Sequence, residues 1–234
     1  MDRHEPMAGC YGKLPSRGDF VSRRLPRSFV QPWDAWLQRA LAASTAQLGA
    51  GWLETWLASP FWRFALAPGL CGPQAWLGVL MPSADRVGRP FPFTVAVPRP
   101  PAPVAVRLAL HARAWFEAVE ALMLSALHPE HDPARLDDDL AALPAPAEPA
   151  WTGGRRAWHV PLPAGERTLA GFAAALDGLA GAGLGPHSAW MTTGSNDVPA
   201  SLLVCAGLPP EDGFASLLDG QWNDPAWSGS PREP

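Results

Sequence analysis

Three apolar segments follow one another in the first half of the chain, and each is bounded by proline or glycine. They cover residues 61–66, 76–81 and 91–97. Short apolar runs between such breakers are typical of buried strands. Because the three strands come in direct succession, the pattern favours antiparallel meander pairing over crossover units.

Helical periodicity dominates the segments on either side of these strands. In residues 32–48 the apolar side chains recur on one face, and Pro32 suits a first helical position. The full pattern predicts helices at 32–48, 52–57, 105–127, 133–143, 168–179 and 211–218, and further strands at 8–14, 157–162, 188–193 and 201–205. We therefore expect an α+β fold with a mixed, largely antiparallel sheet flanked by helices, in a single compact domain.

A proline-rich connector covers residues 144–150. A stretch of this composition is stiff and extended, and it either crosses the surface of one domain or separates two lobes. The sequence favours one domain over residues 1–222, with 8–143 and 151–222 as possible lobes. Residues 223–234 are expected to form a loose C-terminal tail.

Composition narrows the classes of function. Hydrophobic residues make up 47% of the 234 residues and charged residues 17%, and the net charge is -4. This balance excludes an acidic disordered protein, and the lack of a basic excess argues against nucleic-acid binding. No apolar run follows the charged residues 1–6, and prolines interrupt the uncharged stretch 64–84. We therefore expect a cytoplasmic protein without a signal peptide or membrane insertion.

Catalytic and metal-binding motifs are not recognisable in this sequence. It has no P-loop, no GxGxxG after a strand, no GxSxG elbow and no HExxH. Cys10, Cys71 and Cys205 lie far apart and lack zinc spacing, which indicates free thiols in a reducing compartment. We expect no cofactor and no metal.

Two polar loops interrupt the hydrophobic background, at residues 11–26 and 81–92. In each, a strand leads into Pro-Ser, then into charges around a glycine, and then to a phenylalanine. Such side chains either tie the two loops together through Arg–Asp pairs or present arginine to an acidic or phosphorylated partner. The candidate residues for these two roles are Lys13, Ser16, Arg17, Asp19, Ser83, Asp85, Arg86 and Arg89.

Four ordered motifs in the first half resemble the TagF (ImpM) family associated with type VI secretion. They are YGKLPSRGDFV at 11–21, PWDAWL at 32–37, PFWRF at 60–64 and PSADRVGRPFP at 82–92. The resemblance covers roughly residues 8–130, and 188–194 fit it more loosely. Pro90 departs from the less rigid residue expected there, which concerns the shape of the loop.

The resemblance implies a regulator rather than an enzyme. By it, the chain would be a non-catalytic, post-translational repressor of a bacterial type VI secretion system. It would act beside a threonine kinase and phosphatase pair by binding a secretion or signalling component, in particular the forkhead-associated scaffold protein.

Two other classes of function stay open at this point. The first is a structural or assembly subunit of the secretion apparatus that uses exposed aromatic anchors. Trp33, Trp36, Trp52, Trp56 and Trp62 supply these candidates, one or two of which should be exposed. The second is a cryptic hydrolase that uses Ser16, Ser83, Asp19 or Asp85, although no activating base is recognisable.

Overall fold

The computed structural model describes residues 7–100, 112–128, 131–132, 134–146, 152–154, 157–159, 185–222 and 225–227. The predicted helix 168–179 and residues 160–162 of the predicted strand 157–162 lie outside these described residues. The start of the predicted helix 105–127 also lies outside the described residues.

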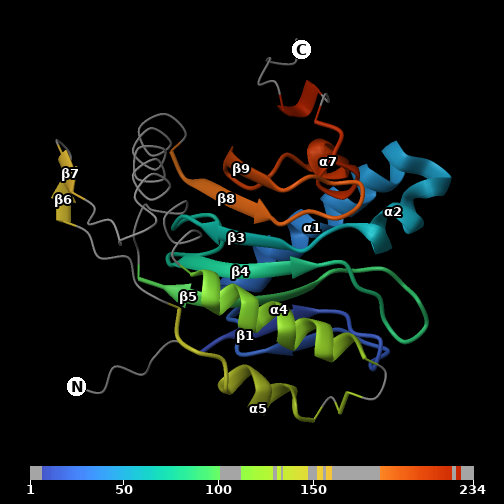
Figure 1. Cartoon of the computed structure of the whole chain (residues 1–234), viewed down its shortest axis with the longest axis horizontal. Coiled ribbons are helices and arrows are strands. Elements are labelled where there is room, and N and C mark those ends of the chain that lie inside the picture. Colours follow the sequence, from blue (N-terminus) through green and yellow to red (C-terminus); the bar gives the residue numbers. More distant parts are fainter. Residues whose placement is uncertain are drawn as a thin grey trace.

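An antiparallel sheet of seven strands forms the centre of the described molecule (Figure 1). Its strands are β1 (Gly9–Gly12), β2 (Val21–Arg23), β3 (Trp62–Leu66), β4 (Ala75–Met81), β5 (Phe93–Arg99), β8 (His187–Thr192) and β9 (Ser201–Ala206). Their order is β2-β1-β5-β4-β3-β8-β9, and every neighbouring pair is antiparallel. A separate hairpin joins β6 (Thr152–Gly154) to β7 (Ala157–His159). The α+β class and the β3-β4-β5 meander predicted from the sequence are confirmed.

Residues far apart in the sequence share this sheet. β8 pairs with β3, so that Phe64 lies opposite Trp190, and β9 continues the sheet beyond β8. The segment that follows the proline-rich connector therefore completes the same sheet as the first half of the chain.

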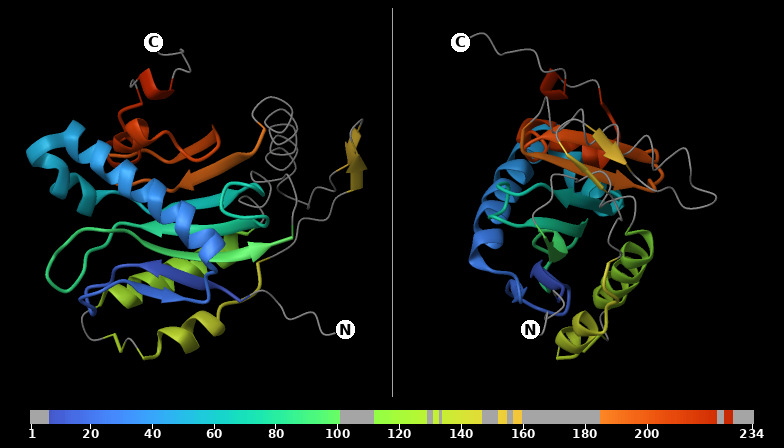
Figure 2. Two further views of the ribbon diagram at one scale, coloured as in Figure 1. Left: turned by 180° about the vertical axis from the view of Figure 1, so that it is seen from behind. Right: turned by 90° about the vertical axis from the view of Figure 1, so that its left-hand side faces the viewer.

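Helices cover both faces of the sheet (Figure 2). One face carries α1 (Arg27–Leu48), η1 (Gly49–Gly51), α2 (Trp52–Ala58), η2 (Glu211–Gly213) and α7 (Phe214–Asp219). The other face carries α4 (Arg113–Leu127) and α5 (Leu136–Ala141). Side chains alternate along β3, so that Phe64 and Leu66 face α1 while Ala65 faces α4.

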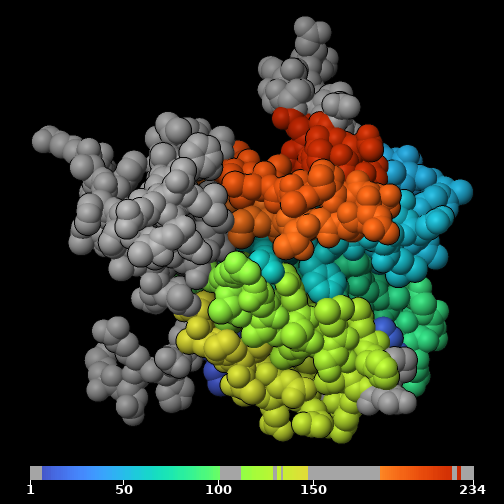
Figure 3. Space-filling model, in the orientation of Figure 1, coloured from blue at the N-terminus to red at the C-terminus, as the bar shows by residue number. Residues whose placement is uncertain are grey.

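The sheet face covered by α4 is only partly protected. α4 packs over β4 and β5, whereas part of the segment that contains β8, β9 and the loop between them lies at the surface beside it (Figure 3, orange). Arg63 of β3 joins α4 to the sheet through two hydrogen bonds to the Glu120 carboxylate, of 2.6 and 2.8 Å. This bidentate pair marks the border between the covered and uncovered halves.

Tryptophan fills the core on the α1 face. Trp33 and Trp190 stack with their ring centroids 6.0 Å apart and their planes at 3°. Their indole nitrogens donate to Thr94 Oγ1 and Ser188 Oγ at 3.1 and 2.9 Å. Because each indole N–H finds a partner, these large side chains are buried without an unsatisfied donor.

The prediction that one or two of the early tryptophans are exposed is wrong. Trp33, Trp36, Trp56 and Trp62 are all buried, and Trp52 is half-buried. The half-buried Trp52 stacks on Trp56 and donates to Ser44 Oγ at 2.9 Å. The helical spacing therefore reflects packing and does not supply surface anchors.

Helix α1 begins five residues before the predicted boundary. Pro26 is extended, at φ -72° and ψ 156°, and the helix starts at Arg27. Pro32 lies inside the helix, so the proline that precedes the helix is Pro26. Pro32 is tolerated near the start because it removes only one backbone donor of a 22-residue helix.

The described part of the C-terminal tail packs on the protein. A short 3-10 helix, η3 (Pro225–Trp227), brings the Trp227 indole to Ser216 Oγ at 3.0 Å. Trp222 and Trp227 are both packed against the core on the α1 face. In residues 225–227 the expected loose tail is therefore replaced by aromatic packing.

Candidate interaction site

The two polar loops meet at one end of the sheet. We use the term paired loops for residues 13–20, which follow β1, and 82–92, which join β4 to β5. Gly12 of β1 and Met81 of β4 both lie opposite Phe93 of β5. Since β1 and β4 flank β5, both loops leave the sheet at the same end of the strands, on the right of Figure 1.

Asp85 is the centre of the contacts between the loops, and its side chain is fully buried. One carboxylate oxygen accepts the backbone N–H groups of Val87 and Arg89, at 3.1 and 2.9 Å. The other lies 3.1 Å from Lys13 Nζ and 2.6 Å from Arg89 Nε. Both oxygens of a buried carboxylate are thus satisfied.

These contacts decide the ionisation state of Asp85. Burial by itself raises the pKa of the carboxyl group, but the hydrogen bonds from Arg89, Lys13 and Val87 outweigh it. Together they hold the pKa of Asp85 well below its ordinary value. The group is therefore a permanent anion at neutral pH, and its role here is to fix two cationic side chains.

Three further hydrogen bonds join the loops directly. Ser83 Oγ donates to the carbonyl of Lys13 at 2.8 Å, and the backbone N–H of Arg86 donates to the carbonyl of Arg17 at 2.8 Å. The guanidinium of Arg89 donates to the carbonyl of Gly18, also at 2.8 Å. The paired loops are thus one braced unit.

Gly12 permits this close approach. Its φ is +137°, and a Cβ there would overlap the carbonyl oxygen of Pro92 and lie 2.8 Å from Phe93 Cα. An L side chain rarely adopts this φ, and no space exists for it. Glycine at the end of β1 is therefore a requirement of the site.

Aromatic rings support the paired loops from the side of α1. Phe20 stacks on Tyr11 at 5.5 Å and meets Phe91 edge-on at 4.7 Å, and Lys13 Nζ lies 5.3 Å above the Phe20 ring. The Tyr11 hydroxyl donates to Asp34 of α1 at 2.6 Å. Burial and this hydrogen bond to an anionic acceptor raise the pKa of Tyr11, which stays a neutral donor.

The remaining candidate side chains point outward. Arg17, Asp19 and Arg86 are exposed, and the described residues give their side chains no hydrogen bond or ion pair. The side chain of Arg89 is 62% exposed even though it bonds Asp85. Val87, 69% exposed, adds an apolar group to the same surface.

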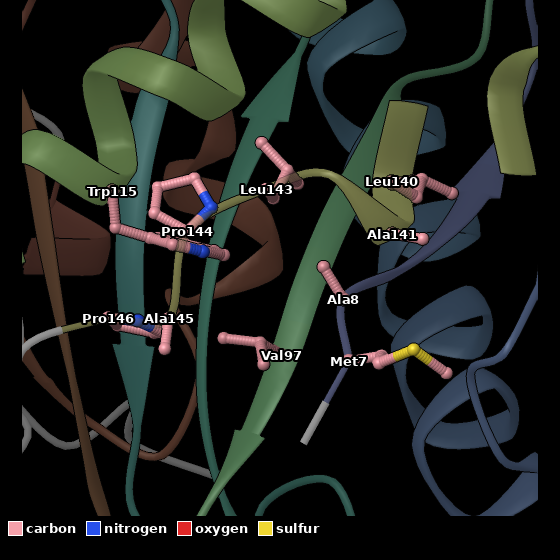
Figure 4. Close-up of a pocket in the computed structure, with 10 residues that line it drawn as sticks. All are labelled: Met7, Ala8, Val97, Trp115, Leu140, Ala141, Leu143, Pro144, Ala145 and Pro146. Atoms are coloured by element: carbon pink, nitrogen blue, oxygen red, sulfur yellow. The ribbon is translucent and has the colours of Figure 1, made fainter. Parts of the chain in front are cut away.

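Other cavities in the described part of the chain are poorer candidates for a site. A pocket of about 70 Å³ is lined by Met7, Ala8, Val97, Trp115, Leu140, Ala141 and residues 143–146 (Figure 4). It contains no titratable side chain and is smaller than the ~300–1,000 Å³ typical of small-molecule sites. A larger groove of about 500 Å³, between α1 and the segment after β9, has only Arg39 and Glu211 as charged residues, and they pair with each other at 2.6 Å.

Comparison with known proteins identifies the family. The profile of the TagF N-terminal domain, described as type VI secretion system-associated, matches residues 9–143. The chain belongs to the TagF family. The match spans more than half of the chain and includes both of the paired loops.

A solved structure extends the similarity beyond that domain. The crystal structure of PA0076 from Pseudomonas aeruginosa PAO1 is 42% identical to this TagF-family chain, with a TM-score of 0.76. The alignment covers 97% of this chain and 98% of that one. A comparison with curated proteins returns no match.

The geometry divides the predicted site residues into two groups. Lys13, Ser83, Asp85 and Arg89 brace the loops. Arg17, Asp19 and Arg86 present their side chains to solvent, while Ser16 is half-buried and its hydroxyl has no partner among the described atoms. Partner binding by these residues stays a prediction.

Sequence reasoning missed the supporting contacts of the TagF-family site. It proposed Arg–Asp pairs, but Lys13 supplies one of the two cations at Asp85. The candidate residues do not include Tyr11 and Asp34, although Tyr11 is the single tyrosine of the chain and begins the first motif. The sequence does contain a signal for Tyr11, because it is a residue type that the rest of the chain lacks and it lies next to a charged loop.

The described part of the TagF-family chain contains neither a candidate membrane span nor a candidate metal site. Its helices include none with the length and apolarity that a bilayer crossing requires. Its His, Cys, Asp and Glu side chains form no group of three that could hold a metal ion.

Proposed function

We propose that this TagF-family chain is a non-catalytic, post-translational repressor of a type VI secretion system. It would act in the cytoplasm by binding a secretion or signalling component, and the family resemblance points to the forkhead-associated scaffold protein. The observation that carries the proposal is the paired loops, which hold exposed arginines on a rigid support.

Charge favours an acidic partner surface. The paired loops contain Lys13, Arg17, Arg86 and Arg89 against Asp19 and Asp85, a net charge of +2 in a chain whose net charge is -4. A local excess of positive charge on a molecule that is negative overall steers an acidic surface to the paired loops and sets the orientation of that surface. Arginine also binds carboxylates in a bidentate manner, which lysine does not.

Rigidity supports a binding role. The hydrogen bonds of Asp85 fix the backbone that carries Arg86 and Val87, and the Arg86–Arg17 backbone bond fixes the second arginine. A surface that is already ordered loses less conformational entropy when a partner binds. Bracing and binding are therefore compatible roles for one site.

The serines of the loops support a non-catalytic function. Ser83 is buried, and its hydroxyl donates to a backbone carbonyl. The sequence of the paired loops contains no histidine, and the buried carboxylate of Asp85 is occupied by Lys13 and Arg89. A serine nucleophile needs a base within hydrogen-bond reach, and among the described atoms neither serine hydroxyl is hydrogen-bonded to a histidine, lysine or carboxylate side chain.

One observation favours a second candidate function, an assembly subunit of the apparatus. Leu53 and Leu57 lie one helical turn apart on α2 and are 48% and 61% exposed. Trp56 of the same helix donates to the Ser83 carbonyl at 3.1 Å, so α2 is attached to the second loop. Stable copurification with the secretion apparatus, lost in Leu53→Ser with Leu57→Ser, would favour this function over repression.

Charge reversal at the paired loops tests the proposal. Arg17→Glu with Arg86→Glu removes two exposed cations that make no described side-chain contact, so the double variant should fold. Pull-down from native cells should lose the partner, and secretion should be derepressed. A matched control, Arg27→Glu with Arg135→Glu, makes the same change of charge at two exposed arginines outside the paired loops, at the start of α1 and just before α5. Equal binding and repression by both variants would refute the role of the paired loops.

A further inference from the structure

The two edges of the seven-stranded sheet are protected very differently. β2 is three residues long, carries Arg23 and is followed by Arg24 and Pro26. Short length, charge and proline are the devices by which proteins prevent a free edge from pairing with another strand. β9, at the other edge, is six residues long and carries neither a charge nor a proline within the strand; Pro199 lies two residues before it.

The surroundings of β9 are also uncharged. No Asp, Glu, Lys or Arg occurs between residues 198 and 210. Leu202 is 45% exposed, Leu203 and Val204 are half-buried and Ala206 is exposed. Among the described residues β9 pairs only with β8, so its outer backbone groups have no strand partner.

The sheet face next to this edge is apolar, and it is exposed at Leu202. Leu202 lies opposite Met191 of β8, and Val204 lies opposite Ala189. Met191 and Val204 are half-buried and pack against the core on the α4 side, in which Ala189 is fully buried. Figure 3 shows that the orange segment that contains β8, β9 and the loop between them reaches the surface on this side.

We propose that β9 pairs with β9 of a second copy of this chain and forms an antiparallel dimer. A two-fold axis perpendicular to the sheet places the α4 faces of both copies on the same side. Two residues that lie opposite each other across the new strand pair must therefore point to the same face. An axis at Leu203 meets this condition: Leu202 then lies opposite the partner subunit's Val204, and Ser201 lies opposite the partner subunit's Cys205.

Self-pairing suits this edge better than pairing with a foreign strand. Without charges near β9, the two-fold axis brings no like charges together, and no charge pattern selects a different partner. The pairing satisfies the outer backbone groups of both strands. It also joins the two half-open apolar faces into one that buries Leu202 and Val204 of each copy.

Sedimentation of the full chain over a wide concentration range tests the dimer. Leu202→Lys places a charge on the edge and should weaken the dimer by about tenfold or more while leaving the fold intact. The control is Leu124→Lys, at a 57% exposed site on α4, which should leave the dimer unchanged. A wild-type chain that is monomeric throughout, or a dimer that Leu202→Lys does not weaken, would overturn the proposal.

A disulfide tests the register independently of Leu202. Leu203→Cys places one thiol near the two-fold axis in each copy and should crosslink the dimer on mild oxidation. Leu53→Cys, at an exposed site outside the sheet, should not. The natural cysteines are buried and should not compete. If the wild-type dimer forms but Leu203→Cys does not crosslink it, the proposed register is wrong.

Discussion

The ammonium nitrogen of Lys13 lies 3.1 Å from a carboxylate oxygen of Asp85, and these two side chains join two loops that are distant in the sequence. The lysine also contacts the Phe20 ring and the carbonyl of Arg89. A single buried cation thus links three parts of the site. The arginines that face solvent depend on this link for their position.

Neutralising Asp85 should change the dependence of stability on pH. The pKa of Asp85 is lowered in the folded protein. Its stabilising contribution is therefore present above the unfolded value, near pH 3.8, and is lost as the pH falls through the folded pKa. Asp85→Asn should lower the melting temperature at pH 7, and the difference from wild type should shrink below about pH 4.

Melting temperatures at pH 7, 4 and 2.5 measure this effect, with the exposed Asp19→Asn as the control. A constant difference between wild type and Asp85→Asn at all three pH values would contradict it.

Arg89 and Arg86 should respond differently to truncation. Arg89→Ala loses hydrogen bonds to Asp85 and Gly18 from a largely exposed side chain and should cost about 1 kcal/mol in the free energy of unfolding. The Arg86 side chain makes no described hydrogen bond or ion pair, so Arg86→Ala should change the free energy of unfolding by no more than about 0.5 kcal/mol. Urea unfolding of both variants measures the difference, and equal free energies would mean that Arg89 does not brace the loops.

Gly12→Ala should destabilise the protein strongly. The new methyl group would meet the Pro92 carbonyl at a φ that alanine disfavours. We expect a loss of about 2–3 kcal/mol in the free energy of unfolding. Gly51→Ala is the control, because nothing lies within 4 Å of a Cβ at that position. Chemical denaturation should rank Gly12→Ala far below Gly51→Ala, and the reverse order would refute the close approach.

Truncation of Trp190 should destabilise the whole molecule. Trp190 belongs to β8, but its ring packs on Trp33 and Phe64 of the first half. Trp190→Ala should lower the free energy of unfolding by about 3–5 kcal/mol and retain one cooperative transition. Calorimetry distinguishes this outcome from two transitions, which would indicate separately folding lobes.

The three thiols should be unreactive in the native protein. Burial raises the pKa values of Cys10, Cys71 and Cys205 to about 12, so the thiolate fraction at pH 8 is very small. A thiol reagent such as DTNB should modify none rapidly in the folded chain and all three after unfolding. Since these pKa values are raised above the ordinary 9.0, the neutral buried thiols also contribute to stability. Their contribution is complete below pH 9 and declines as the pH rises further.

Rapid modification of a single native cysteine by the same reagent would contradict the burial of that residue.

Local patterns in the sequence predicted most of the elements. The strands β3, β4 and β5 follow from three apolar segments between breakers, and the face of α1 follows from the spacing of Trp33, Trp36 and Leu37. These features depend on neighbours within one or two turns, which a sequence displays directly. The site could be located as two loops by the same reasoning.

Only the tertiary structure decided which polar residues lie inside the site. Arg17 and Asp19 are of the same residue types as Arg89 and Asp85 and lie in a similar loop. Nevertheless, Arg17 and Asp19 are exposed without a described partner, whereas Asp85 and Arg89 are paired with each other. The difference arises because β1 and β4 flank β5 and bring distant loops together, so that Lys13 can reach Asp85. Strand pairing brings together residues that are far apart in the chain, and hydrophobic periodicity does not predict which strands pair or in which register.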